Sequence, residues 1–206
     1  MLDSKTLALR ITLPDAPGML ASMAESIAGL GGNIVDVDVH QIGGDHVVDD
    51  VIVQIPPDVT PAALRAALLE AGASSVVSTP DHHRTTDTGV RAIEAMERVL
   101  LEPGDEGLAQ GLARLVDADA VEVVAPTAGQ AESEACSRRQ PVTLAVHTGD
   151  SIDHVLALPF PAPDVHGVVR LSRRGLRFTT TEVTRARALL RLAVASSARG
   201  AMRRVP

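Results

Sequence analysis

The chain has 206 residues, enough for one large domain or two small ones, and its 45% hydrophobic content excludes a globally disordered protein. Its only aromatic residues are Phe160 and Phe178, so the core must be built from aliphatic side chains, and the single cysteine, Cys136, excludes an intrachain disulfide or a cysteine zinc cluster. No apolar run approaches the roughly 20 residues that span a bilayer, and residues 1–10 lack the pattern of a secretory signal. These features predict a cytoplasmic protein that is not bound to a membrane.

The formal net charge of −7 disfavours nucleic-acid binding, but the charge is unevenly distributed. Residues 1–140 carry 9 basic and 22 acidic side chains, a balance of −13, whereas residues 141–206 carry 10 basic and 4 acidic, a balance of +6. Two interpretations remain open. The asymmetry marks a basic segment for an acidic partner, or it reflects attraction between the two halves or between neighbouring subunits.

The first 80 residues alternate between strand and helix patterns. Residues 5–13 have apolar side chains at every second position, which is typical of a half-buried strand. Residues 14–18 break this strand with two prolines, and an apolar stripe at helical spacing then runs from Leu20 to Leu30. Gly31 and Gly32 end the predicted helix.

Two further strands and a second helix follow. The strand at 33–42 is expected to place Val35, Val37 and Val39 on one face and three polar residues, Asp36, Asp38 and His40, on the other. A short turn leads into a strand at 46–55, whose apolar face is interrupted by Asp49. Thr60 and Pro61 form a typical helix start, and a short strand at 75–79 completes the unit.

This order predicts an α+β protein whose first part is a ferredoxin-like βαββαβ unit. Each predicted helix has a single apolar stripe, so both helices must cover the same face of the sheet. The opposite face, with Asp36, Asp38 and His40, is then left to solvent or to another subunit.

Two motifs in this unit resemble the ACT domain family. Residues 13–20, Leu-Pro-Asp-Ala-Pro-Gly-Met-Leu, are similar to its strand-to-helix loop, and residues 31–34, Gly-Gly-Asn-Ile, to its entry into the second strand. The resemblance implies amino-acid sensing at an interface between two ACT units. It also implies a set of ligand-binding residues, namely Asp15, Ala16, Pro17, Gly18, Met19, Leu20, Asn33 and Ile34.

The chemistry of these residues suits such a ligand. A helix N-terminus offers unpaired N–H groups to a carboxylate, and Gly18 lets the ligand approach the backbone. Asp15 can accept from an ammonium group, and Asn33 can both donate and accept. A purely structural interpretation stands beside this one, in which Asp15 caps the helix, Gly18 serves the turn and Asn33 adopts a left-handed conformation.

The second half is less regular. After a polar linker at 81–90, two helical stretches are expected around residues 93–101 and 108–116, followed by a strand at 120–124 and a mobile loop at 126–139 that contains Cys136. Three apolar runs, at 141–146, 154–159 and 165–171, are candidate strands. A long helix is expected to begin at Thr179, which has capping-box spacing to Glu182, and to continue to about Ser197.

The end of the chain resembles the last part of a GAF domain, on the runs 156–159, 167–171 and 178–182. The resemblance implies that residues 91–206 form a shortened GAF-like domain that serves contact and dimerisation, with no cofactor.

Other candidate sites are weak. Carboxylates and imidazoles gather near the central hairpin, but the alternation that gathers them is also typical of an ordinary polar sheet face, which we favour over a metal site. His82 and His83 are expected to be a solvated pair, and no catalytic triad, P-loop or dinucleotide motif is present.

The sequence therefore predicts a non-catalytic regulatory or sensor protein, with a homodimer of residues 1–80 binding an amino acid. The alternatives are a regulatory subunit that docks on a separate metabolic enzyme and a ligand-free structural dimerisation protein.

Overall fold

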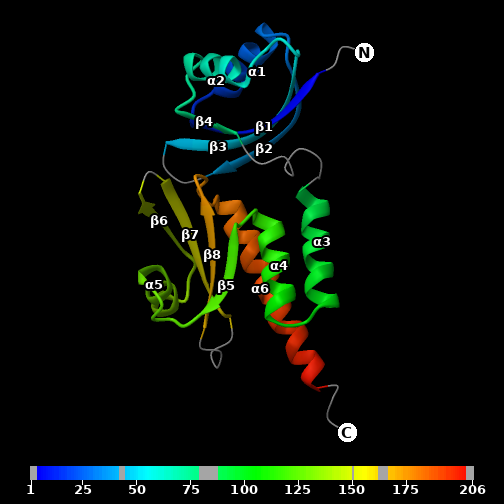
Figure 1. The fold of residues 1–206 in the computed structure, drawn as a ribbon, viewed down its shortest axis with the longest axis vertical. Helices are drawn as coiled ribbons and strands as arrows, with labels where there is room; N and C mark the ends of the chain where they lie inside the picture. Colours follow the sequence, from blue (N-terminus) through cyan, green and yellow to red (C-terminus); the bar gives the residue numbers. More distant parts are fainter. Residues whose placement is uncertain (1–3, 42–44, 79–87, 150, 162–166, 203–206) are drawn as a thin grey trace. The chain divides into compact units, whose positions relative to one another are not determined.

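The computed structural model describes residues 4–41, 45–78, 88–149, 151–161 and 167–202, and within them the protein is α+β, with two four-stranded antiparallel sheets and six helices (Figure 1). The chain divides into two compact units, Met1–Thr86 and Asp87–Pro206. The predicted linker at 81–90 lies largely outside the described residues. None of the described helices is both long enough and apolar enough to cross a bilayer.

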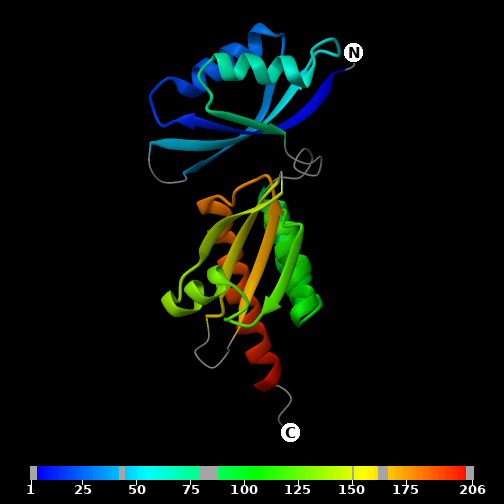
Figure 2. The same ribbon diagram turned by 60° about the vertical axis from the view of Figure 1, so that its left-hand side comes forward.

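The first unit has the predicted order of strands and helices, and its sheet order is β2-β3-β1-β4. Its two helices cover one face of the sheet, as expected from their single apolar stripes (Figure 2). The elements are β1 (Lys5–Pro14), α1 (Met19–Gly29), β2 (Asn33–Gln41), β3 (His46–Ile55), α2 (Pro61–Glu70) and β4 (Ser75–Ser78).

The core of this unit lies between the sheet and the two helices. Met23 and Ile27 of α1 and Leu64 and Leu68 of α2 are buried against alternate residues of β1 and β3. The Thr60 side chain accepts a hydrogen bond of 3.1 Å from the Ala63 N–H, which confirms the predicted start of α2.

The predicted faces of β2 are partly wrong. A β-bulge between Ile34 and Asp36 shifts the register, so that Ile34, rather than Val35, lies beside Val53 on the helix-covered face. Val35 is the extra residue of the bulge, and its side chain is 53% exposed. Strict alternation does not predict this bulge, because the inserted residue, Val35, is itself apolar and continues the alternation of Val37 and Val39.

The second unit places helices on both faces of its sheet, whose order is β5-β8-β7-β6. Helices α3, α4 and α6 pack together, and α4 and α6 share a core with the central strands, whereas α5 lies on the opposite face (Figures 1 and 2). The elements are α3 (Thr88–Leu101), α4 (Asp105–Val116), β5 (Ala120–Val124), α5 (Gln130–Arg138), β6 (Val142–Thr148), β7 (Ser151–Pro159), β8 (Val168–Arg174) and α6 (Thr180–Met202).

The mobile loop predicted at 126–139 is instead largely the helix α5, so this prediction is wrong. Its apolar contact with the sheet is made by small side chains, Ala131 and Ala135, which are buried against Ala157 and Val168. Two alanines at i and i+4 are too small to form a visible apolar stripe in a polar segment. Cys136 is therefore a half-buried residue of a helix and not part of a flexible loop.

The capping box that was predicted for the last helix is confirmed. The Thr179 N–H donates to Glu182 at 2.7 Å, and the Glu182 N–H donates to the Thr179 hydroxyl at 3.2 Å. The C-terminal helix buries Ala186, Leu189 and Leu190 in the core of the unit.

Candidate functional site

The predicted site begins with the loop between β1 and α1. Pro14 ends the strand, and the Asp15 N–H donates to the carbonyl of Asp45 at 2.8 Å, which fixes the start of the loop beside β3. The loop then turns at Gly18, whose φ of +91° is in the left-handed region that favours glycine. A Cβ at Gly18 would have nothing within 4 Å, so glycine is needed here for its conformation and not for lack of space.

The start of α1 has no side-chain cap among the described residues. Gly18 occupies the N-cap position, the first turn carries no acidic side chain, and no side chain accepts from its N–H groups. Asp15 therefore does not cap this helix, which removes one of the structural explanations for its presence. The residues 15–18 are exposed, and Leu20, which was expected in the buried stripe, is 42% exposed. This end of α1 offers N–H groups to an anion from solvent.

The other two predicted residues lie at the far end of the same sheet. On β3, the partner of Pro14 is His46, whereas the partner of Asn33 is Gln54. At about 3.3 Å per residue, these two positions are about 26 Å apart along the strand. One unit therefore does not bring Asp15 and Asn33 together. Ile34 packs partly into the core, and Asn33 is exposed.

Asn33 also lies on an edge strand. In the order β2-β3-β1-β4, β2 has a neighbour on one side only, so its other edge is free to pair within the part of the chain that the structure describes. An antiparallel pair of two β2 strands sets the start of one opposite the end of the other. In such a pair, Asn33 of one copy lies at the same end of the sheet as Asp15 of the other, so a site built from two copies can combine the two residues.

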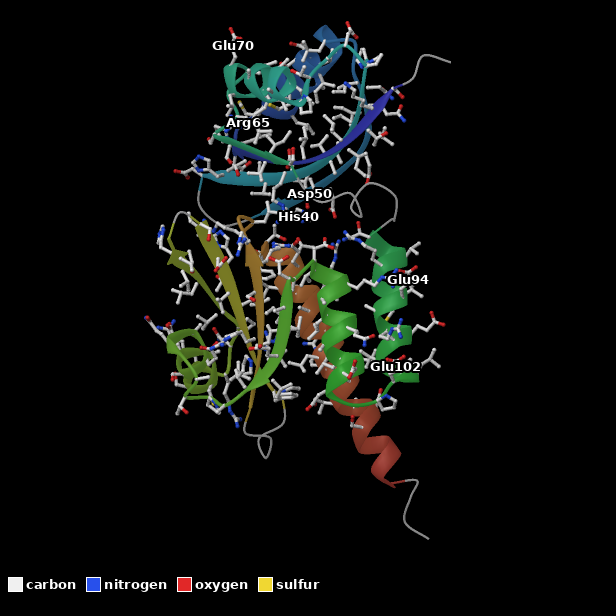
Figure 3. The ribbon with its side chains drawn as sticks, viewed as in Figure 1. His40, Asp50, Arg65, Glu70, Glu94 and Glu102 are labelled. Carbon is white, nitrogen blue, oxygen red and sulfur yellow. The ribbon has the colours of Figure 1, made fainter. Side chains whose placement is uncertain are left out.

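A charged cluster lies on the sheet face away from α1 and α2. The Arg10 guanidinium donates to both carboxylate oxygens of Asp50, at 2.7 and 2.6 Å, and the Nε2 of His40 lies 3.1 Å from Asp50 (Figure 3). Burial raises the pKa of Asp50, but the hydrogen bonds and charges of Arg10 and His40 outweigh burial and hold this pKa well below its usual range.

Asp49 points to the opposite face from Asp50. Its partners across the sheet are Ile11 and Val39, which places it on the helix-covered side, where it is 2% exposed. Its Oδ1 has no hydrogen-bond partner among the described residues. Burial is the main reason that the pKa of Asp49 is raised; the charge of His40 lowers it and that of Asp50 raises it.

The place of Asp49 on the helix-covered face agrees with the predicted strand at 46–55, whose apolar face it interrupts. Arg10 was missed as a functional group, although it is a basic residue within the alternating pattern of β1. Among the described residues, no group of three or more His, Cys, Asp or Glu side chains is arranged to hold a metal ion.

Comparisons with known proteins leave the family open. No family model matches the chain, and no curated protein sequence matches it. The solved structures that share features with it include the C-terminal domain of MgtC from Mycobacterium tuberculosis, at 16% identity and a TM-score of 0.33, which covers 41% of this chain and 95% of that domain.

Two other structures match over most of the chain. A protein from Galdieria sulphuraria is 13% identical, with a TM-score of 0.36 over 96% of this chain and 91% of its own. A formyltetrahydrofolate deformylase from Pseudomonas putida KT2440 is 10% identical, with a TM-score of 0.36 over 98% of this chain and 97% of its own. TM-scores this low support no conclusion about function, so any functional argument must come from the residues themselves.

Proposed function

We propose that residues 1–80 form a ferredoxin-like regulatory unit of the ACT type, which binds an amino acid between two copies of the chain. In this proposal the protein is regulatory and not catalytic. The observation that carries the proposal is the exposed, uncapped start of α1 behind the Asp15–Gly18 loop, in a unit with the element order expected of that family.

Each part of an amino acid has a counterpart in this arrangement. The ligand's carboxylate accepts from the N–H groups of the first turn of α1, where the helix dipole adds favourable electrostatic energy. Asp15 is exposed beside this turn and takes the ammonium group. Asn33 is too distant to act in the same unit, so it acts from the second copy, in a two-fold dimer that joins the β2 edges.

The proposal is tested first by measuring binding. The full chain is screened against the twenty amino acids by thermal shift, and a ligand at 100 times its Kd is expected to stabilise the protein by about 2.7 kcal/mol. Asp15→Ala and Asn33→Ala are each expected to weaken binding at least tenfold. Asp58→Ala, an exposed carboxylate on the loop before α2, is the matched control and should bind as the unmodified chain does.

A mixing experiment then tests the shared site. If each site combines the loop of one copy with Asn33 of the other, a mixture of the Asp15→Ala and Asn33→Ala proteins regains about a quarter of the sites, because a two-fold mixed dimer has one intact site. If both variants fail to bind and their mixture also fails, the site does not span two copies. Absence of any amino-acid ligand would overturn the proposal and, with a stable dimer, favour the structural dimerisation protein.

A further inference from the structure

The second unit contains a groove that the proposed function does not use. It has a volume of about 350 Å³ and lies on the sheet face that carries α5. Helix α5 covers only one end of this face, where Ala131 and Ala135 meet Ala157 and Val168. Within the described residues of this unit, no helix covers the remainder of the face, and the groove runs from the start of α5 across all four strands. A cavity of this size is in the range of small-molecule sites.

The floor of the groove is one row of the sheet. Ser172 in β8 is paired with Ala120 on one side and with Val155 on the other, and Val155 is paired with Leu144 at the edge of the sheet. Val146 extends this apolar edge by one row. The side chains of the floor are therefore small in the centre and aliphatic toward β6, and they provide a surface for a hydrocarbon chain.

Carboxylates stand in the two rows that flank this floor. In the row on the side of α5, Glu122 is the register partner of Arg170, and Glu132 reaches the same guanidinium from the first turn of α5. In the row on the other side, Asp153 of β7 is the register partner of Arg174 and of Val146. Arg170 and Arg174 mark the two rows along β8, four residues or about 13 Å apart.

Arg170, the one arginine among the described residues that line the groove, is already paired. The Nε of Arg170 donates to Glu132 at 2.5 Å, and Glu132 is buried, whereas the closest approach of Arg170 to Glu122 is 3.9 Å. Burial raises the pKa of Glu132. The hydrogen bond and charge of Arg170, together with a backbone hydrogen bond, outweigh burial and lower this pKa overall, so the carboxylate stays ionised. Glu122, which is 60% exposed, is left with a weak contact only.

The contacts of Asp153 are similarly weak. The Thr148 hydroxyl lies 3.1 Å from one of its oxygens, and the Arg174 guanidinium lies 3.6 Å from the other. Arg174 is 75% exposed, and such a surface contact neutralises little charge. Among the described residues, the lining of the groove therefore holds three carboxylates and one guanidinium, with Glu122 and Asp153 in the rows on either side of its floor.

We propose that this groove binds a small organic cation, an aliphatic amine or diamine. The first ammonium group pairs with Glu122, the alkyl chain lies on Val155, Leu144 and Val146, and a second ammonium group reaches Asp153. The site is separate from the predicted ACT loop, so its occupancy does not depend on the amino-acid proposal.

The test measures binding of defined amines to the full chain by isothermal titration calorimetry. n-Butylamine, 1,4-diaminobutane and spermidine are the probes, with butyrate as an anionic control of similar size. Affinity is expected to rise along the amine series, because longer diamines and polyamines reach both carboxylates. Butyrate is expected not to bind, since the lining is acidic.

Variants locate the site. Glu122→Gln is expected to weaken 1,4-diaminobutane binding at least tenfold, and Asp153→Asn to weaken spermidine more than n-butylamine. Glu134→Gln is the matched control. Glu134 is a carboxylate of the neighbouring helix α5 that pairs with Arg138 and does not line the groove. The proposal is overturned if no amine binds, if butyrate binds equally well, or if Glu134→Gln has the same effect as Glu122→Gln, which would indicate non-specific attraction to an acidic protein.

Discussion

Each unit contains an arginine–carboxylate pair joined by two hydrogen bonds, and the two pairs lie on different faces of their sheets. In the first unit, the Arg10–Asp50 pair lies on the face that the helices leave uncovered. In the second unit, Arg173 of β8 points to the face under α6 and pairs with Glu182 at 3.0 and 3.1 Å. Both partners are buried, and the Arg173 guanidinium lies 4.4 Å from the centre of the Phe178 ring.

The difference lies in how completely the charges under the helices are satisfied. Arg173 also donates to the carbonyls of Val116, Leu176 and Arg177, so its hydrogen bonds match the five N–H donors of a guanidinium. Asp49, the charge under the helices of the first unit, has an oxygen with no partner among the described residues. A buried charge therefore stabilises the fold only where its whole hydrogen-bonding capacity is used.

The largest effect is expected from Arg173→Met. This substitution removes the guanidinium that pairs with the buried Glu182 and that donates to three carbonyls, and a cost of about 3–5 kcal/mol in the free energy of unfolding is expected. Chemical denaturation measures the loss, and hydrogen exchange places it in β8 and α6. Arg174→Met, on the adjacent exposed position, is the control and should cost less than about 0.5 kcal/mol. Equal losses in the two variants would show that the buried hydrogen bonds of Arg173 are not the source of its contribution to stability.

A smaller loss is expected from Asp50→Asn in the first unit, about 1.5–3 kcal/mol at neutral pH, because a charged acceptor of two Arg10 hydrogen bonds is removed. The folded pKa of Asp50 is lowered, so its contribution is present above the unfolded pKa and is lost as the pH falls toward the folded value. Denaturation of both proteins between pH 7 and pH 2 should therefore show their stabilities converging below about pH 4. A constant difference over this range would show that the carboxylate charge is not the cause.

Most of the helices and strands of both units were predictable from the sequence. Alternating apolar residues and proline or glycine breaks located the strands of the first unit, and the Thr179–Glu182 spacing located the last helix, because these signals are local. The bulge at Val35 and the helix α5 were missed. The first is set by pairing with β3, and the second by the fit of two alanines against β7 and β8, so both depend on contacts distant in the chain.

The candidate site was predictable only in part. The Asp15–Gly18 loop follows from a local motif, and the left-handed Gly18 has the conformation that such a turn requires. That Asn33 lies at the other end of the sheet follows from the parallel direction of β1 and β2, which both pair antiparallel with β3 and which the motif does not encode. The split of Asp49 and Asp50 between two faces follows from the alternating pattern, in which their positions differ by one, and the predicted strand already had Asp49 on its apolar face.

Asp49→Val tests the buried charge whose hydrogen bonds are incomplete, and it is expected to stabilise the first unit. It removes a buried carboxylate without a full set of partners from a position beside Ile11 and Val39, and a gain of about 1–2 kcal/mol at pH 7 is expected. Because the folded pKa of Asp49 is raised, the unmodified protein loses stability as the pH rises from the unfolded toward the folded pKa. The variant should lack this loss. A destabilised variant at pH 7 would mean that the carboxylate has a favourable role.

The smallest effect concerns the helix starts of the two units. Thr60 caps α2 by one hydrogen bond at an exposed position, whereas the cap of α6 is buried, reciprocal and joined to Arg173 through Glu182. Thr60→Ala removes an isolated bond and is expected to cost about 0.5–1 kcal/mol, with faster hydrogen exchange confined to the first turn of α2. Thr179→Ala removes one member of a connected buried network, so its cost should exceed that of Thr60→Ala and its exchange effects should extend into β8. Similar, local effects in both variants would show that the network around Arg173 is not cooperative.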